Sequence, residues 1–343
     1  EMMKLSDDGF WWYETSLVDG DYFYQFNVDG EKLIADPWSK DVEWKDIIGF
    51  SESADYSRAK TKFTIGAQDF DWSDESFSRP IINELIIYEL HIGDFSPDID
   101  RYGLYNDVTA KIESGYFESL GINAIELMPV NEFEGEYSWG YNPSFYMAPE
   151  SAYGTPDEFK NLVNTAHEHG IAIILDVVFN HTWGSAPLFQ LYQPTGSFEW
   201  QDHNFELCPY FDAEESLWGY KLENWHQVGG RQYRAWKYVL DALETWVNDY
   251  HIDGFRFDQA HLISSETAKI ILERLRNINP RVYIYGEAWD NKGAKFSEMG
   301  WGSFNAHFRD VLRGDLWDYS KKGFLFGSYR PNENKDELVN IIS

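Results

Sequence analysis

The chain has 343 residues, of which 43% are hydrophobic and 25% are charged, and its formal net charge is −30. This length suits about two folded domains, and the composition excludes a disordered, collagen-like or coiled-coil chain. The acidic excess disfavours nucleic acid and anionic membrane surfaces as partners, because both would repel the chain. Aromatic residues make up 18% of the chain. We expect most of these rings in a core, and the surplus favours a neutral ligand with flat apolar faces.

Cysteine content and hydropathy add little about location. The single cysteine, Cys208, excludes an internal disulfide framework. No apolar run approaches the roughly 18 residues of a membrane span. The first residues do not resemble a signal peptide. The compartment and the oligomeric state therefore stay open.

Residues 1–72 predict a partial β-sandwich of short strands. An aromatic-rich strand is expected over residues 10–17, and a second precedes Asp29-Gly30, which predicts a tight turn into a third. The polar stretch at residues 73–83 predicts a linker between this part and the next.

From residue 84 to residue 343 the pattern alternates between strands and helices, which predicts a (β/α) barrel or a doubly wound parallel sheet. No glycine-rich phosphate loop follows the first strand, which disfavours the doubly wound nucleotide fold. Residues 182–230 are too long for a plain loop and predict a functional insertion, a small domain within the barrel. The strands are expected at residues 85–91, 122–128, 171–179, 252–257, 282–285 and near 303–308.

One helix start is predicted in detail. Thr155 can cap the helix, Pro156 suits its first position, and Glu158 completes a capping box. This helix is expected to end at Gly170.

Polar residues stand at the carboxyl ends of three expected strands, where barrel enzymes place their active sites. Asp258 and Glu287 are the principal pair, because two carboxylates about 5 to 5.5 Å apart suit retaining glycoside hydrolysis. Arg256 lies two residues before Asp258 and points to the same side of the strand. Its charge would keep Asp258 ionised as a nucleophile requires, whereas Glu287 would hold a proton at neutral pH. The alternative is a structural Arg–Asp pair beside an unrelated exposed Glu.

A metal centre is a second alternative. The lone His91 on the first strand disfavours it, since hydrolytic metal barrels commonly carry paired histidines there. The residues of the ligand types that a hydrolytic metal centre uses are Asp176, His181, Asp258, His261 and Glu287.

Three segments, at residues 176–181, 254–258 and 286–289, resemble signature segments of the α-amylase family of glycoside hydrolases, in the family's order. Residues 88–91 and 139–143 also look like its first strand and the loop after its second strand. The resemblance extends from about residue 84 to about residue 320 and implies a (β/α)8 barrel. The part before it resembles the carbohydrate-binding β-sandwich that precedes the barrel in branching enzymes, isoamylases and pullulanases.

The resemblance implies a role for each catalytic residue. Asp258 would form a covalent glycosyl intermediate, Glu287 would act as general acid/base, and Arg256 would orient the nucleophile. The chemistry would need no cofactor. Asn180 matches a position that often binds a structural calcium ion in this family.

Other residues would contact the sugar or support the site. By the resemblance, His181 would hydrogen-bond the sugar, Tyr141 would stack under it, and Asp176 would support the site from the third strand. His261 is a candidate contact at the next subsite or a support of the site. The candidate sugar platforms among the tryptophans are Trp183, Trp218, Trp225 and Trp289.

The family also uses a third carboxylate, preceded by a histidine, after its seventh strand, and no such segment follows residue 308. About six barrel strands are expected, so the sequence predicts a C-terminally truncated barrel that is inactive alone. The substrate would be an α-1,4-linked or α-1,6-linked glucan of the starch or glycogen type. Residues 286–289 favour a hydrolase. A transferase such as a branching enzyme and a non-catalytic glucan-binding protein are the alternatives.

Overall fold

The computed structural model describes most of the chain outside three larger gaps, at residues 44–58, within residues 195–230 and within residues 315–343. The described residues are 3–7, 9–43, 59–135, 137–194, 204, 207, 208, 210, 211, 219–222, 231–288, 292–314, 318, 320, 322 and 323.

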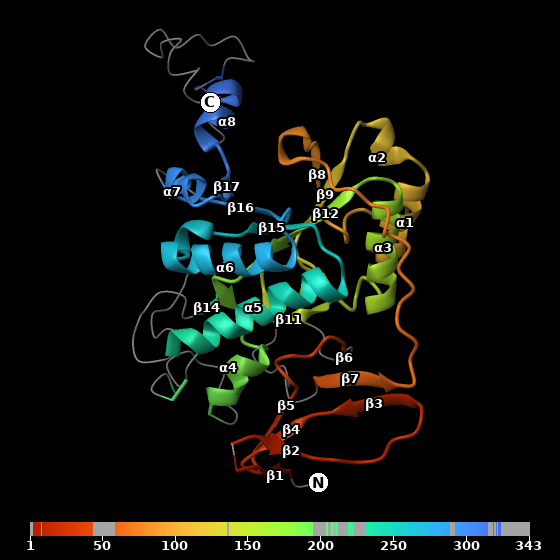
Figure 1. The fold of residues 1–343 in the computed structure, drawn as a ribbon, viewed down its shortest axis with the longest axis vertical. Coiled ribbons are helices and arrows are strands. Elements are labelled where there is room, and N and C mark those ends of the chain that lie inside the picture. Colours follow the sequence, from red (N-terminus) through yellow and green to blue (C-terminus); the bar gives the residue numbers. More distant parts are fainter. Residues whose placement is uncertain are drawn as a thin grey trace.

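Six parallel strands form one curled sheet, and each strand pairs with its neighbours in chain order (Figure 1). A doubly wound sheet reverses its strand order at one point, and this sheet does not. The expected (β/α) barrel architecture is therefore confirmed, and all six expected strands are present. They are β8 (Ile87–Leu90), β9 (Ala124–Leu127), β12 (Ala172–Val177), β15 (Gly254–Phe257), β16 (Tyr283–Gly286) and β17 (Gly302–Ser303).

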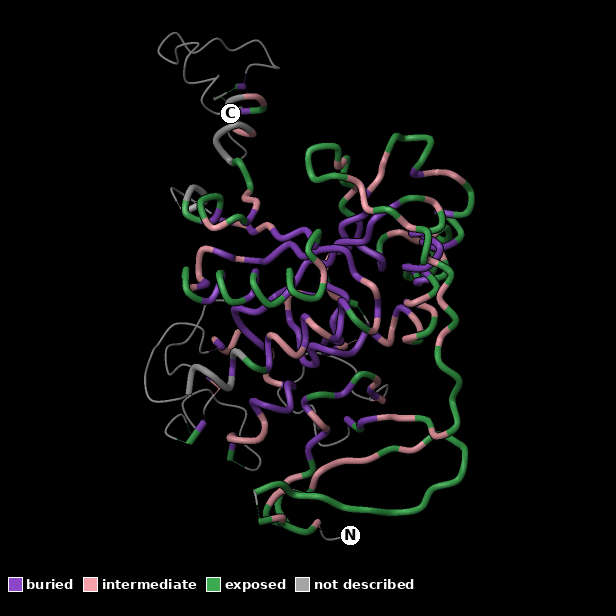
Figure 2. The backbone as a smooth tube through the Cα atoms, in the orientation of Figure 1, coloured by how far each residue is buried: buried purple, intermediate pink, exposed green. Residues whose placement is uncertain are grey.

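Helices connect these strands and cover the outside of the sheet, so the strands form the buried centre of the molecule (Figure 2). In β12 every residue is buried, as a parallel strand under helices requires. The helices are α1 (Tyr105–Glu113), α2 (Tyr116–Ser119), α3 (Pro156–Glu168), α5 (Arg231–Asp249), α6 (Ser265–Ile278), α7 (Lys292–Glu298) and α8 (Ala306–Arg313).

The predicted start of α3 is confirmed. The Oγ1 atom of Thr155 accepts from the backbone N–H of Glu158 at 3.2 Å, and the Glu158 carboxylate accepts from the N–H of Thr155 at 2.7 Å. Phe159 and Leu162 on the inner face of the helix are 0% exposed. The cap and the apolar face thus act together, one fixing the start of the helix and the other its orientation.

A hairpin after β9 was not predicted. It consists of β10 (Asn131–Phe133) and β11 (Pro143–Pro149), and every residue of both strands is buried. The indole N–H of Trp246 on α5 donates to the carbonyl of Tyr146 at 2.8 Å. The hairpin therefore fills the space between the sheet and α5.

The N-terminal residues form three small antiparallel sheets. The predicted turn is confirmed, because Asp29 and Gly30 have φ of 56° and 76° and join two paired strands. A continuous strand over residues 10–17 is wrong. Only Trp11 and Trp12 pair, and Trp11 is 63% exposed, because no second layer covers it. The strands are β1 (Lys4–Leu5), β2 (Trp11–Trp12), β3 (Gly20–Tyr24), β4 (Phe26–Val28), β5 (Lys32–Ile34), β6 (Val42–Glu43) and β7 (Lys60–Ile65).

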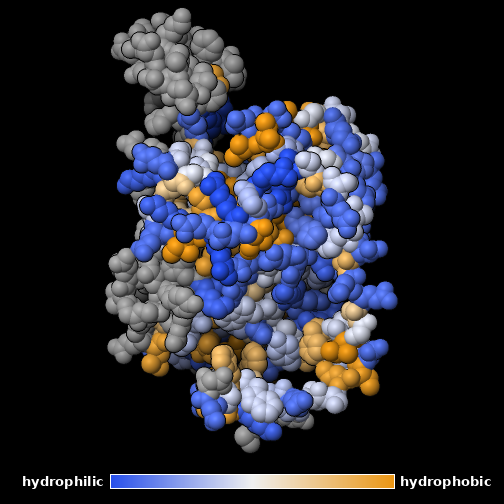
Figure 3. Space-filling view, in the orientation of Figure 1, coloured by the Kyte–Doolittle hydropathy of each residue, from blue (hydrophilic) through white to orange (hydrophobic). Residues whose placement is uncertain are grey.

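Exposed hydrophobic side chains gather over these N-terminal strands at the lower end of the view (Figure 3). Contacts to α5 and to the insertion attach this part of the chain to the barrel. Tyr238 donates to the carbonyl of Pro37 at 2.9 Å, and Lys32 donates to the carbonyl of Leu191 at 3.2 Å. The division into domains stays a prediction.

The expected linker at residues 73–83 contains no helix or strand before a short 3₁₀ turn, η2 (Ile82–Glu84). It is nevertheless attached to the barrel, because Asp74 contacts His167 and Arg79 pairs with Asp253. The described parts of the insertion are few. They comprise β13 (His181–Thr182), α4 (Pro187–Tyr192), β14 (Tyr220–Lys221) and single residues between them. Within the described residues, no helix is long and apolar enough to cross a membrane.

Candidate active site

The parallel register of the sheet brings three polar side chains to one level. Asp176 on β12 pairs with Arg256 on β15, which pairs with Tyr285 on β16. Residues at the same level of a curled sheet point to the same side. The Tyr285 hydroxyl donates to Glu126 on β9, across the sheet, so this side is the barrel interior. Asp258 and Glu287 follow directly at the carboxyl ends of β15 and β16.

Arg256 lies at the centre of the site and joins three carboxylates. One terminal nitrogen is 2.8 Å from Asp176 and 3.0 Å from Asp258, and the other is 3.2 Å from Glu287. Burial acts to lower the pKa of Arg256, but the surrounding carboxylates, Asp176 foremost, hold that pKa above its usual value. Since Glu287 is 13% exposed and paired with Arg256, the alternative of an unrelated exposed Glu is wrong. The expected convergence of the two acids is present.

Each acid is held by a further amide. The side chain of Asn180 donates to Oδ2 of Asp258 at 2.9 Å. Gln259 donates twice to Oε2 of Glu287, from its backbone at 3.1 Å and from its side chain at 3.0 Å. Among the described residues, no hydrogen-bond donor contacts Oε1 of Glu287. One oxygen of this carboxylate is thus anchored, and the other is available for proton exchange.

The role of Gln259 was not predicted. Its backbone is left-handed, with φ 45° and ψ 40°, which turns the chain sharply after Asp258. An L side chain adopts this conformation at a cost in free energy. Both donors of Gln259 reach Glu287 from this turn. Neither periodicity nor a turn signal at residues 258–259 indicates this conformation in the sequence.

Asp176 supports the site as expected, through Arg256 and through the Tyr141 hydroxyl, which donates to it at 2.7 Å. Burial raises the pKa of Asp176 to about 8, against the opposing effects of Arg256 and Tyr141. His181 is buried, which lowers its pKa, and its ring nitrogens contact the carbonyl of Tyr141 at 2.8 Å and the side chain of Asn180. The polar atoms of His181 and Tyr141 thus engage protein groups, and their sugar contacts stay predictions.

Aromatic residues surround the polar centre. The Phe304 ring, 39% exposed, lies 5.3 Å from the guanidinium carbon of Arg256 and forms an apolar wall that was not predicted. Trp183 follows β13 and is half-buried, and its backbone N–H donates to the carbonyl of Pro143. His261 is half-buried in the 3₁₀ turn η4 (Ala260–Leu262). The remaining candidate platforms, Trp218, Trp225 and Trp289, lie outside the described residues.

The metal alternatives fit this arrangement poorly. In the part of the chain that the structure describes, no group of three or more His, Cys, Asp or Glu side chains could hold a metal ion. At the centre of the expected ligands stands Arg256, a cation itself. The side chain of Asn180 directs its nitrogen to Asp258 and its oxygen to His181. The structural calcium ion at Asn180 stays a prediction.

Comparison with known proteins agrees with this geometry. Residues 73–238 match the family described as alpha amylase, catalytic domain. The chain belongs to the α-amylase family. It is 32% identical over 277 residues to a malto-oligosyltrehalose trehalohydrolase of Saccharolobus solfataricus, covering 80% of this chain and 43% of that protein. It is 30% identical over 261 residues to a 1,4-alpha-glucan branching enzyme of Picrophilus torridus, covering 75% of this chain and 33% of that one.

Among solved structures, a pullulanase from Anoxybacillus sp. LM18-11 in complex with maltotetraose is similar to this member of the α-amylase family. The TM-score is 0.68 at 25% identity, covering 95% of this chain and 51% of that one. This similarity supports the barrel architecture independently of the sequence matches. The chain spans less than half the length of the trehalohydrolase and of the branching enzyme.

Proposed function

We propose that this protein is a retaining glycoside hydrolase that cleaves α-1,4 or α-1,6 glucosidic bonds in α-glucans of the starch or glycogen type. The observation that carries the proposal is the contact of one guanidinium, Arg256, with both Asp258 and Glu287. Two carboxylates held by one side chain lie close together, as the retaining mechanism requires. Similarity to a pullulanase solved with maltotetraose supports a malto-oligosaccharide ligand.

In the first step, an oxygen of Asp258 attacks the anomeric carbon while Glu287 gives its proton to the departing glycosidic oxygen. Arg256 and Asn180 each hold one oxygen of Asp258 and so fix the orientation of its carboxylate. In the second step, Glu287 takes a proton from water, which attacks the anomeric carbon and releases Asp258. Because the configuration inverts twice, the product keeps the α configuration.

The test is to incubate the full-length protein with amylose and with pullulan and to follow the first product by proton NMR. An α-anomer that appears before mutarotation supports the proposal, whereas a β-anomer contradicts it. Asp258→Asn should abolish turnover of every substrate. Glu287→Gln should still form the covalent intermediate with an activated aryl glycoside, whose leaving group needs no proton. Asp98→Asn, a change at an exposed position in the loop after β8, serves as the matched control.

The second candidate function is transfer of a glucan chain to a sugar acceptor, which the similarity to a branching enzyme favours. The chemistry is the same up to the covalent intermediate. The same incubation separates the two functions, since new α-1,6 branch points on amylose indicate transfer and shortened chains indicate hydrolysis. A protein that binds amylose and leaves it unchanged would be a non-catalytic glucan binder.

A further inference from the structure

A cavity of about 340 Å³ lies at the opposite end of the barrel from Arg256 and its carboxylates. Its walls come from segments that precede strands, namely the ends of α3, α5 and α6, and from the segment before η2. It therefore opens at the amino ends of the strands. The lining residues are Asp74, Phe77, Arg79, His167, Val247, Asn248, His251, Ile278, Asn279 and Arg281.

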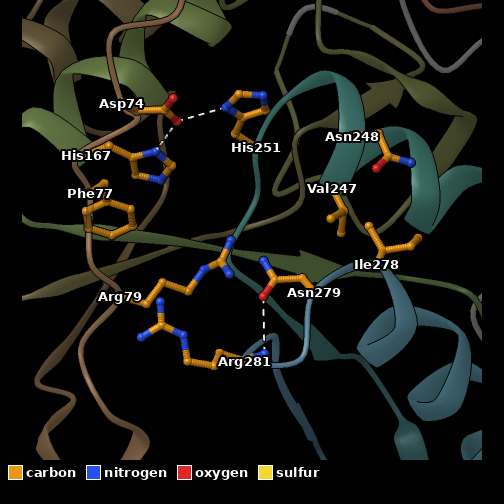
Figure 4. A pocket seen from close by; sticks show the side chains of 10 residues that line it. All are labelled: Asp74, Phe77, Arg79, His167, Val247, Asn248, His251, Ile278, Asn279 and Arg281. Carbon is orange, nitrogen blue, oxygen red and sulfur yellow. Dashed lines mark hydrogen bonds and ion pairs between the residues drawn. The ribbon is translucent and has the colours of Figure 1, made fainter.

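Two arginines extend into this cavity from different segments, and the side-chain amide of Asn279 lies beside them (Figure 4). Arg79 is fixed through Nε by an ion pair with Asp253, a carboxylate that is 0% exposed. This pairing leaves the terminal amino groups of Arg79 to face the cavity. Arg281 precedes β16 and is exposed, and its backbone N–H is fixed by the side chain of Asn279 at 3.1 Å.

The two guanidinium groups act on one common neighbour. Burial and the charge of Asp253 raise the pKa of Tyr283 to about 12, and the positive charges of Arg79 and Arg281 both oppose this rise. Both arginines also line the same cavity. Like charges at close range repel each other, and this juxtaposition becomes favourable when an anion lies between them.

The two aspartates beside the cavity are shared with histidines. Asp253 is shared between Arg79 and His167, and Asp74 is shared between His167 and His251. Among the described residues, Arg281 forms no ion pair, although Asp and Glu number 58 in the chain against 28 Lys and Arg. Arg281 therefore presents to the cavity a positive charge that no described carboxylate pairs with.

We propose that this cavity binds a small phosphate-bearing molecule, with Arg79 and Arg281 holding the phosphate group. A guanidinium presents paired N–H donors that match two phosphate oxygens. The volume suits a ligand of one sugar ring or less in addition to the phosphate. Phe77, which stacks on His167 with ring centroids 4.1 Å apart, supplies an apolar wall for the rest of the ligand.

The test is isothermal titration calorimetry of the full chain with inorganic phosphate, glucose 1-phosphate and glucose at low ionic strength. We expect saturable binding of at least one phosphate compound, and an excess of glucose, which fits the proposed α-glucan site, should not displace it. Tighter binding of glucose 1-phosphate would identify a sugar phosphate as the ligand, and equal binding would identify the free anion. Absence of saturable binding of both phosphate compounds up to about 10 mM, a Kd equivalent to about −3 kcal/mol, would overturn the proposal.

Variants then assign the site. Arg281→Ala should weaken phosphate binding at least tenfold, and Arg281→Lys should restore only part of it, because lysine lacks the planar fork. Arg274→Ala removes an exposed α6 arginine that pairs with Glu244 away from the cavity, and it should leave binding unchanged. Equal binding by Arg281→Ala and the wild-type chain would refute the assignment. Thermal unfolding of each variant without ligand shows whether it is folded.

Discussion

Replacing Asp253 by alanine should cause a large loss of stability. This carboxylate is 0% exposed and accepts three hydrogen bonds, from Arg79, from His167 at 2.9 Å and from the backbone N–H of Ile173 at 2.7 Å. Removing it leaves the Arg79 guanidinium without its carboxylate partner and leaves His167 with Asp74 alone. It also leaves the buried N–H of Ile173 without an acceptor. Breaking a buried ion pair costs about 3 to 5 kcal/mol, and an unsatisfied buried donor costs about 1 to 3 kcal/mol.

These two costs are not additive, because the protein relaxes around the space that the Asp253 carboxylate leaves. We therefore expect a total loss of unfolding free energy of about 4 kcal/mol. The measurement is equilibrium urea unfolding followed by tryptophan fluorescence, with the change taken from the midpoint and the slope. The matched control is Asp249→Ala. Asp249 pairs with Lys40, and its side chain is 37% exposed, so its loss should cost less than about 1 kcal/mol. Equal losses in the two variants would refute the reasoning.

Three further predictions concern other parts of the molecule. Gln259→Leu removes the side-chain donor that holds Oε2 of Glu287 at 3.0 Å, so the less firmly positioned acid should lower kcat of the full-length protein about tenfold; an unchanged kcat would contradict this. Burial acts to lower the pKa of His167, but Asp253 and then Asp74 raise it above its usual value. Its contribution to stability is complete below about pH 6.5 and is lost as the pH rises through the folded pKa, so the stability advantage over His167→Gln in urea unfolding should shrink as the pH rises above about 6.5. Thr155→Ala should lower the unfolding free energy by about 1 kcal/mol, and Thr155→Ser should restore most of it.

The sequence identifies the strands and the acids because both depend on local composition. A run such as residues 171–179 is apolar on both faces, which only a covered strand tolerates. Carboxylates at the carboxyl ends of such strands, here Asp258 and Glu287, then indicate the position of the site. Asp258, Glu287 and Arg256 could be placed together for this reason, since the parallel order of the strands fixes their proximity once the barrel is assumed.

The missed features depend on partners far away in the chain. The hairpin of β10 and β11 contains Glu132, a residue typical of surfaces, which is 1% exposed because Ser151 satisfies its carboxylate through a backbone N–H at 2.7 Å and a hydroxyl. Phe304 lies at the site because its loop follows β17, the sixth strand of the sheet. The error at residues 10–17 has the converse cause, since aromatic residues favour strands only where another layer covers them.

The two ends of the barrel both combine arginine with carboxylates, but in different proportions. At the carboxyl end, one arginine stands among three carboxylates, so acidic groups predominate at this centre. A transition state with oxocarbenium character develops positive charge, and such a centre stabilises it. At the amino end, Arg79 and Arg281 extend into one cavity, and we expect a bound anion to be stabilised there instead.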